Sequence, residues 1–81
     1  MDNRVSVISI IIKEETAAGA VNALLHEYRR YIVGRMGIPY RERSISIISV
    51  VLDAPGNVTS SLSGKLGMID GVSAKTLTAR L

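Results

Sequence analysis

Two segments of the chain are apolar at nearly every position, and in both of them the apolar side chains alternate between the two faces of a strand. In residues 4–13, one face carries Val5, Val7 and Ile11, and the other carries Ile8, Ile10 and Ile12. In residues 44–53, one face carries Ile45, Ile47 and Val51, and the other carries Ile48, Val50 and Leu52. A strand that is apolar on both faces suits the buried centre of a sheet, so both segments are predicted to be central strands.

Two other segments show the spacing of amphipathic helices, in which apolar side chains recur every three or four residues. Residues 16–30 carry such a stripe, formed by Ala17, Val21, Leu24, Leu25 and Tyr28. Thr16 is predicted to cap the start of this helix. The second helix is predicted to start at Asp53 and Pro55 and to end at Gly67 as its C-terminal cap. Its stripe consists of Val58, Leu62 and Leu66.

The remaining strands are shorter or more polar. Residues 31–36 alternate weakly and predict a short strand, and residues 37–43 contain the Gly and Pro of a loop. This loop would close a hairpin onto residues 44–53. Gly71 is predicted to turn the chain into a last strand over residues 72–79, whose polar alternation suits the edge of a sheet.

The predicted order is strand, helix, strand, strand, helix, strand. This βαββαβ order is that of the ferredoxin-like fold, an α+β two-layer sandwich in which an antiparallel four-stranded sheet has two helices on one face. The first and third strands then lie at the centre, and both carry apolar residues on the face that the helices do not cover. We therefore expect a second subunit to cover that face in a homo-oligomer, either a dimer or a tetramer. The alternative is an apolar face that stays partly exposed.

Length and composition narrow the class of protein. With 81 residues, the chain is expected to form a single domain over residues 1–81, and 47% hydrophobic residues exclude a disordered chain. No Cys is present, which excludes disulfides and Cys-ligated metal sites, and we expect no cofactor. Neither a secretory signal nor a membrane span is recognisable, so we expect a cytoplasmic protein that does not bind membranes.

Positive charge is concentrated in one segment of a chain whose formal net charge is +3. Residues 29–43 contain five of the ten basic residues, all of them arginines: Arg29, Arg30, Arg35, Arg41 and Arg43. Tyr28, Tyr31 and Tyr40 lie in or beside this segment. Arginine and aromatic side chains together suit binding of an anion or a nucleic acid. Ion pairs between subunits or a solvated rim would explain the same residues equally well.

Neither a metal site nor a catalytic site is evident from the spacing of the polar residues. His26 is the only histidine and lies off the apolar stripe of its helix, so it could bind a metal only if symmetry brought copies together. Ser63, Gly64 and Lys65 lack the rest of a phosphate-binding loop. The carboxylates show no spacing that suggests an acid–base pair, so we do not expect an enzyme.

The most specific motif of the chain is residues 34–40, Gly-Arg-Met-Gly-Ile-Pro-Tyr. Together with residues 46–50, 53–55, 62–67 and 71–73, it closely resembles the iron-only hydrogenase system regulator family. The resemblance covers nearly the whole chain. It implies an ACT-like regulatory domain, similar to the C-terminal domain of nickel-responsive repressors, in proteins associated with hydrogenase and hydrogenase-maturation genes.

The family motif points to a distinctive surface or pocket, formed by Gly34, Arg35, Met36, Gly37, Pro39, Tyr40 and Arg41, to which the neighbouring Arg43 adds a cation. The glycines permit close backbone approach, Pro39 stiffens the loop, and the Arg and Tyr side chains would bind an anion or a partner. Nickel-responsive repressors use Cys ligands and a preceding DNA-binding segment. Because this sequence has no Cys and its first strand begins directly after Met1, we expect neither nickel sensing nor a separate DNA-reading element.

The resulting expectation is a non-enzymatic, oligomeric regulatory module that senses a small effector in an iron-only hydrogenase system. One alternative is a protein that binds nucleic acid directly through residues 29–43. Another is a scaffold in hydrogenase maturation.

Overall fold

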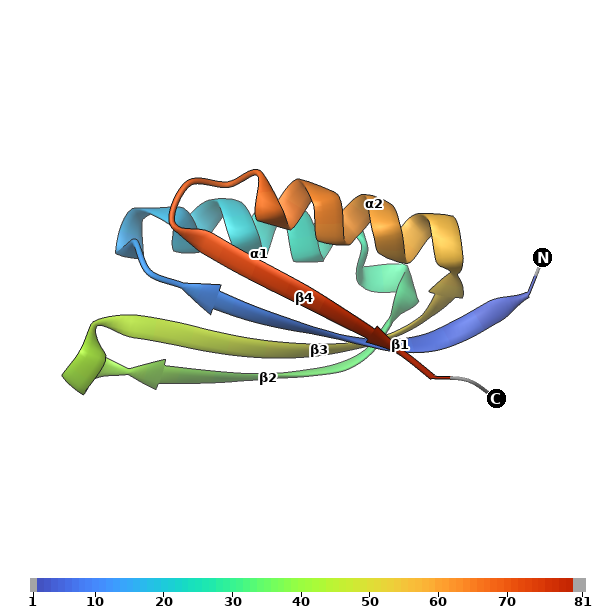
Figure 1. The fold of residues 1–81 in the computed structure, drawn as a ribbon, viewed down its shortest axis with the longest axis horizontal. Coiled ribbons are helices and arrows are strands. Elements are labelled where there is room, and N and C mark those ends of the chain that lie inside the picture. The colour runs from blue at the N-terminus through green and yellow to red at the C-terminus, as the bar shows by residue number, and fades with distance from the viewer. Residues whose placement is uncertain (1, 80–81) are drawn as a thin grey trace.

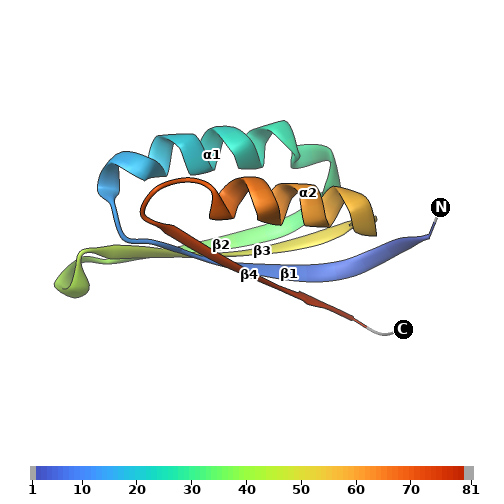
Figure 2. The same ribbon diagram turned by 45° about the horizontal axis from the view of Figure 1, so that its top comes forward.

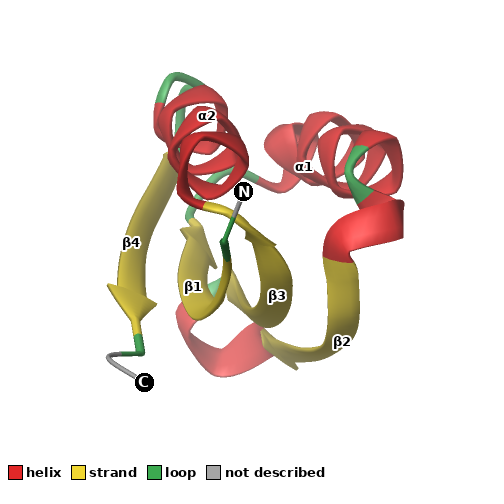
Figure 3. Cartoon of the chain, turned by 90° about the vertical axis from the view of Figure 1, so that its right-hand side faces the viewer, coloured by secondary structure: helices red, strands yellow, loops and turns green. Residues whose placement is uncertain are grey.

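The computed structural model describes residues 2–79 and confirms the predicted order of helices and strands. The strands are β1 (Asn3–Ile12), β2 (Ile32–Tyr40), β3 (Ile45–Pro55) and β4 (Val72–Thr78). The α-helices are α1 (Ala18–Glu27) and α2 (Gly56–Gly67), and the 3-10 helices are η1 (Glu15–Ala17), η2 (Arg29–Tyr31) and η3 (Arg41–Arg43). The four strands form one antiparallel sheet in the order β2-β3-β1-β4, and both α-helices lie on one side of it (Figure 1, Figure 3). The ferredoxin-like α+β class is thus confirmed.

The two apolar strands form the central pair of the sheet, as predicted. β1 and β3 pair along their whole length, from Asn3 opposite Pro55 to Ile12 opposite Ser46. β4 pairs with the other edge of β1, and β2 pairs with β3. The more polar strand is therefore an edge strand, where its outer backbone groups meet water.

One layer of apolar side chains fills the space between the helices and the sheet. Ile8, Ile10, Val50 and Leu52 from the central strands are fully buried there. They pack against side chains from η1 and the two α-helices: Ala17, Val21, Leu25, Leu62 and Leu66. The predicted stripe of the second helix is corrected at one position, because Thr59 is buried where Val58 is only partly so.

The loop predicted for residues 37–43 is wrong over its first half, because β2 continues to Tyr40 and pairs there with Ile45. Gly37 and Pro39 are strand breakers in isolation, but an edge strand tolerates a residue without an N–H group and a residue without a side chain. η3 and Ser44, whose φ of 55° is left-handed, make the turn. As a result, the β2–β3 hairpin projects beyond the helices at one end of the molecule (Figure 2).

The predicted helix ends also require correction. The helix predicted over residues 16–30 divides into η1, α1 and η2, and Thr16 lies inside η1 without capping it. Asp53 remains in β3, and the N-cap of α2 is Pro55. Gly67 is the last residue of α2, followed by Met68 in a right-handed conformation. No side chain caps the start of either α-helix, because the N-cap residues, Ala17 and Pro55, have no polar group in their side chains.

Gly71 makes the turn from the helix layer back to the sheet, as predicted. Its φ of +80° lies in the left-handed region, and a Cβ at this position would be only 2.6 Å from the Cβ of Glu14. Lys13 donates its backbone N–H to the carbonyl of Gly71 over 2.6 Å. Only glycine allows this close approach between the end of β1 and the start of β4.

A polar contact links the two helices on their outer side. Tyr28 and Ser61 share a hydrogen bond of 2.9 Å between their hydroxyls, and the ammonium of Lys65 lies 5.3 Å from the centroid of the Tyr28 ring. The hydrogen bond from Ser61 and the contact with Lys65 hold the pKa of Tyr28 below its ordinary value. Neither helix, nor any other within residues 2–79, is long and apolar enough to cross a membrane.

Candidate functional site

The sheet face opposite the helices is largely apolar on β1, β2 and β3, apart from Ser9 opposite Ser49 at its centre, whereas β4 contributes one apolar residue, Leu77. In the central pair, Val7 lies opposite Val51 and Ile11 opposite Ile47, and strand alternation turns these residues away from the buried core. We call this surface the open sheet face. Its apolar members are Val5, Val7, Ile11, Met36, Ile38, Tyr40, Ile45, Ile47, Val51 and Leu77. Several are large and well exposed, with Leu77 at 75% and Met36 at 62%.

The residues marked by the family motif do not form one pocket, because most of them lie on a strand. Gly34, Met36 and Tyr40 lie opposite Val51, Ser49 and Ile45 and therefore belong to the open sheet face. The second set faces the helix side, opposite Val50, Ile48 and Ser46; it consists of Arg35, Gly37 and Pro39. Arg41 and Arg43 lie in η3 at the tip of the hairpin. The motif thus contributes to two surfaces and a turn.

On the helix side, the motif residues line a shallow groove beside α1. Arg35 donates from Nη2 to Oδ1 of Asn22 over 2.6 Å, which ties β2 to the middle of α1. Gly37 and Pro39 lie farther along the groove, whose volume is about 250 Å³. A larger depression of about 540 Å³ follows toward the tip of the hairpin, between Glu15 and Arg41. Its lining has one acidic and two basic side chains and offers no concentrated charge.

The five arginines of residues 29–43 are close in sequence but separate in space. Arg29 and Arg30 lie in η2 before β2, and Arg41 and Arg43 lie in η3 after it. Because a strand advances about 3.3 Å per residue, the 9 residues of β2 hold the two pairs roughly 30 Å apart. The Arg30 guanidinium lies 5.3 Å from the centroid of the Tyr31 ring. The positive charge is therefore divided between the two ends of an edge strand.

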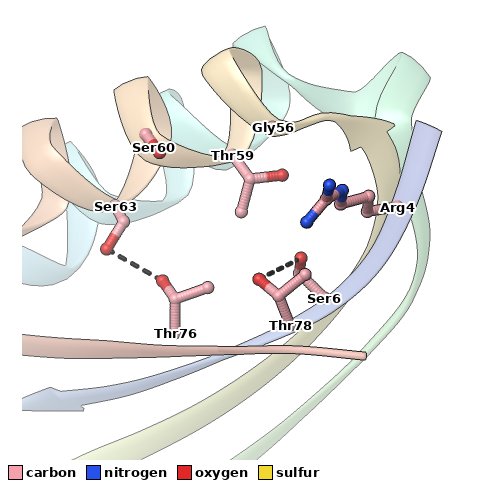
Figure 4. A pocket seen from close by; sticks show the side chains of 8 residues that line it. All are labelled: Arg4, Ser6, Gly56, Thr59, Ser60, Ser63, Thr76 and Thr78. Carbon is pink, nitrogen blue, oxygen red and sulfur yellow. Dashed lines mark hydrogen bonds between the residues drawn. The ribbon is translucent and has the colours of Figure 1, made fainter. Parts of the chain in front are cut away.

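A polar pocket lies between α2 and the strands β1 and β4 (Figure 4). The start of α2, the start of β1 and the end of β4 lie at the end of the molecule opposite the hairpin tip (Figure 1). Its volume is about 510 Å³. One guanidinium, one glycine and six hydroxyl side chains line it: Arg4, Gly56, Ser6, Thr59, Ser60, Ser63, Thr76 and Thr78. We call it the hydroxyl pocket. Within the described residues, its lining contains no carboxylate and no large apolar side chain.

The topology of the sheet assembles the hydroxyl pocket. β3 ends at Pro55 opposite Asn3, so α2 begins directly above the start of β1. Alternation along β1 turns Arg4 and Ser6 toward the helix side, and the register of β4 brings Thr78 opposite Ser6. The two hydroxyls share a hydrogen bond of 3.0 Å. Farther in, Thr76 donates to Oγ of Ser63 over 3.0 Å.

Sequence reasoning missed this pocket. Two signals were available: Ser6 interrupts the apolar face of β1, and hydroxyl residues recur on both α2 and β4. Neither signal identifies a site by itself, because exposed Ser and Thr are common on edge strands and helix surfaces. Only the pairing of β4 with β1 brings the two sets of hydroxyls together.

Metal-binding groups do not converge in the described part of the chain. His26 is exposed in the last turn of α1, where its backbone carbonyl accepts a hydrogen bond from Arg29. Within residues 2–79, no three His, Cys, Asp or Glu side chains lie close enough together to hold a metal ion. The structure thus gives no support within one subunit for His26 as a metal ligand.

Comparisons with known proteins assign the chain to a family. Residues 4–76 match the TM1266-like family, described as "Iron-only hydrogenase system regulator, putative". Among solved structures, the uncharacterized protein TM1266 from Thermotoga maritima is 38% identical, with a TM-score of 0.93 over 98% of this chain and 100% of that one. A formyltetrahydrofolate deformylase from Pseudomonas putida KT2440 has a TM-score of 0.65 at 16% identity. The match covers 94% of this chain but 29% of that enzyme, so it shows a shared fold alone.

No functionally curated protein matches the chain in sequence. The family match spans most of the chain and includes the motif of β2, the whole of α2 and the Gly71 turn. On these grounds, the chain belongs to the TM1266-like family of iron-only hydrogenase system regulators.

Proposed function

We propose that this protein is a non-enzymatic regulatory module of an iron-only hydrogenase system and acts as a homo-oligomer. The observation that carries this proposal is the predominantly apolar surface of the open sheet face, which the paired Ser9 and Ser49 interrupt at its centre. A sheet with helices on one side only needs a second cover for apolar side chains on its other side. Exposed large apolar side chains on one face, such as Met36 and Ile38 on β2 and Leu77 on β4, are typical of a protein interface.

A second copy of this chain is the partner that suits the open sheet face best. Its paired positions in the described chain include only two charged residues, Asp53 and Lys75, of opposite sign. In a two-fold interface the same patch meets itself, so Asp53 of one copy can approach Lys75 of the other. A patch with a large charge of one sign would repel its own copy, and this one does not.

An oligomer of this kind suits a regulatory role. A ligand that binds differently to two arrangements of the subunits shifts the balance between them, and a partner protein can read the difference. The family description supports regulation of an iron-only hydrogenase system in this coarse sense. It is also the reason that we propose a regulator and not an enzyme.

A pair of matched substitutions tests the interface. Met36→Lys places a charge on the open sheet face, whereas Met68→Lys places the same charge on an 85% exposed residue after α2. We expect the wild type and Met68→Lys to sediment as the same dimer or tetramer. Met36→Lys should dissociate at least ten-fold more readily, because a lysine ammonium is costly to bury.

Analytical ultracentrifugation over a range of protein concentrations measures this difference. Far-ultraviolet circular dichroism shows whether each variant stays folded. A monomeric wild type at micromolar concentration overturns the proposal. Equal dissociation of the two variants would place the interface away from the open sheet face.

The projecting hairpin supports a second candidate function. A two-stranded ribbon can enter a groove of a nucleic acid, and this one carries Arg41 and Arg43 at its tip. Fluorescence anisotropy with the duplex upstream of the protein's own gene and a scrambled duplex tests it across about 50 to 200 mM salt. Preferential binding that falls steeply with salt and is lost in the Arg41→Ala, Arg43→Ala double variant supports this function. Failure to bind either duplex excludes it.

A further inference from the structure

The hydroxyl pocket contains a buried hydroxyl that nothing in the described chain satisfies. Thr59 is only 4% exposed, and its Oγ1 has no hydrogen-bond partner within residues 2–79. In Figure 4 this oxygen points toward the side of the pocket on which Arg4 lies. Buried polar groups in proteins almost always have a partner, so an isolated one beside a pocket indicates a ligand atom.

The first turn of α2 adds further donors at the same place. The backbone N–H groups of the first three helical residues have no acceptor within the helix, and the N-cap residue, Pro55, has no side chain that could accept from them. No acidic residue lies in this turn to complement the positive end of the helix dipole. Gly56, the first residue of α2, lines the pocket. Such a helix start favours an anion.

Arg4 supplies a full positive charge to the pocket from β1. Figure 4 shows its guanidinium opposite the start of α2, and no hydrogen bond joins it to the other seven residues drawn. Among residues 2–79, no carboxylate lines the pocket and competes for it. A guanidinium matches the planar, bidentate geometry of phosphate and carboxylate oxygens.

The paired hydroxyls also retain unused donors. In the Thr76–Ser63 pair, Thr76 donates, so the hydroxyl hydrogen of Ser63 is free to donate elsewhere. In the Ser6–Thr78 pair, one of the two hydroxyls is free in the same way. Free hydroxyl donors thus remain both on α2 and on the β1–β4 side of the pocket.

We propose that the hydroxyl pocket binds the phosphoryl group of a small polar ligand. Arg4 approaches from β1, and the first turn of α2 and the Thr59 hydroxyl lie across from it on α2 (Figure 4). The guanidinium, the backbone N–H groups and the hydroxyl together offer enough donors for the three terminal oxygens of a phosphoryl group. The volume of about 510 Å³ exceeds that of a single phosphate and falls in the range of small-molecule sites. The hydroxyl-rich lining favours a phosphate monoester whose remainder is polar.

The idea that the bound ligand is an effector rests on the proposed regulatory function. Binding of phosphate to the hydroxyl pocket can be measured whether or not the protein is a regulator. The probes are inorganic phosphate and glycerol phosphate, and acetate is tested beside them as a carboxylate for comparison. Chloride holds the ionic strength constant, because charge interactions at a surface depend on it. Nuclear magnetic resonance shifts of the backbone amides of Gly56, Asn57 and Thr59 report where the anion binds.

Two variants and one control identify the donors. Arg4→Gln should weaken phosphate binding at least ten-fold, and Thr59→Val, which keeps the shape of the side chain, should weaken it about three- to ten-fold. Arg43→Gln removes the same charge at the hairpin tip and should leave the affinity unchanged. Glycerol phosphate should bind at least as tightly as inorganic phosphate.

Several results would overturn the proposal. One is the absence of shifts at the start of α2 up to about 50 mM phosphate. Another is an equal loss of affinity in Arg4→Gln and Arg43→Gln, which would indicate attraction to net charge alone. Binding of acetate as tight as that of phosphate would overturn the phosphoryl assignment. A protein that binds phosphate but sediments as a monomer would keep the site and exclude the proposed oligomer.

Discussion

The two faces of the central strands are similar in sequence but opposite in environment. On the helix side, Ile8, Ile10, Val50 and Leu52 are completely buried, whereas on the open sheet face Ile11 is 39% exposed. Both faces consist mainly of β-branched and aliphatic residues, although the open sheet face also carries Ser9, Ser49 and Asp53. The main difference is what covers each face, so the same residue type stabilises the fold on one side and can stabilise association on the other.

The largest expected effect comes from comparing substitutions at two neighbouring residues of β1 whose side chains lie on opposite faces of the sheet. Ile10→Ala removes a fully buried side chain and should lower the free energy of unfolding by about 3 to 4 kcal/mol. Ile11→Ala should cost less than about 1 kcal/mol in the isolated subunit, because its side chain is already partly solvated. Urea denaturation at several protein concentrations measures both. Equal losses at low concentration would contradict the division between the two faces.

The next test concerns the turn that returns the chain from the helix layer to the sheet. Gly71→Ala should destabilise the protein by about 2 kcal/mol or more, because it combines a left-handed backbone with a clash against Glu14. Gly64→Ala is the control, since a Cβ there meets open space within α2. It should stabilise the fold by about 0.5 to 1 kcal/mol. Thermal unfolding of the two variants should therefore shift in opposite directions.

A smaller effect on stability is expected at the hydroxyl pocket, where the side of the sheet that the helices cover changes from apolar to polar. Thr59→Val replaces an unpaired buried hydroxyl with a methyl group and should raise the free energy of unfolding by about 1 kcal/mol. Thr76→Val, which breaks the hydrogen bond to Ser63 at an exposed position, should change it by less than about 0.5 kcal/mol. A lower stability for Thr59→Val would mean that its hydroxyl has a partner in solution. Denaturation in phosphate-free buffer separates this result from ligand binding.

The smallest effect on stability is expected at the hairpin tip. Arg41 and Arg43 are exposed and lie beyond the core, so replacing both with Ala should leave the free energy of unfolding within about 0.5 kcal/mol of the wild type. A larger loss, growing with protein concentration, would show that the tip contacts another subunit. The same urea titrations provide this measurement.

The family motif of β2 illustrates why fold and site differ in predictability. Its Gly and Pro residues suggest a loop when judged locally, but pairing with β3 extends the strand to Tyr40. The hydrogen bonds to the strongly apolar strand β3 outweigh the low strand propensity of these residues. Once the motif is a strand, alternation sends Met36 and Arg35 to opposite sides, so a candidate site that is contiguous in sequence is divided in space.

The sequence by itself determined the order of elements, the central pair of strands and the apolar character of both sheet faces. These features depend on residue periods of two and of about three and a half, which are visible along the chain. The tertiary structure alone decided that Arg4, Thr59 and Thr78, distant in sequence, line one pocket, and that the arginines of residues 29–43 lie at two ends of a strand. The physical reason is that contacts between distant residues depend on strand register and on the position of α2 over β1, which no local pattern encodes.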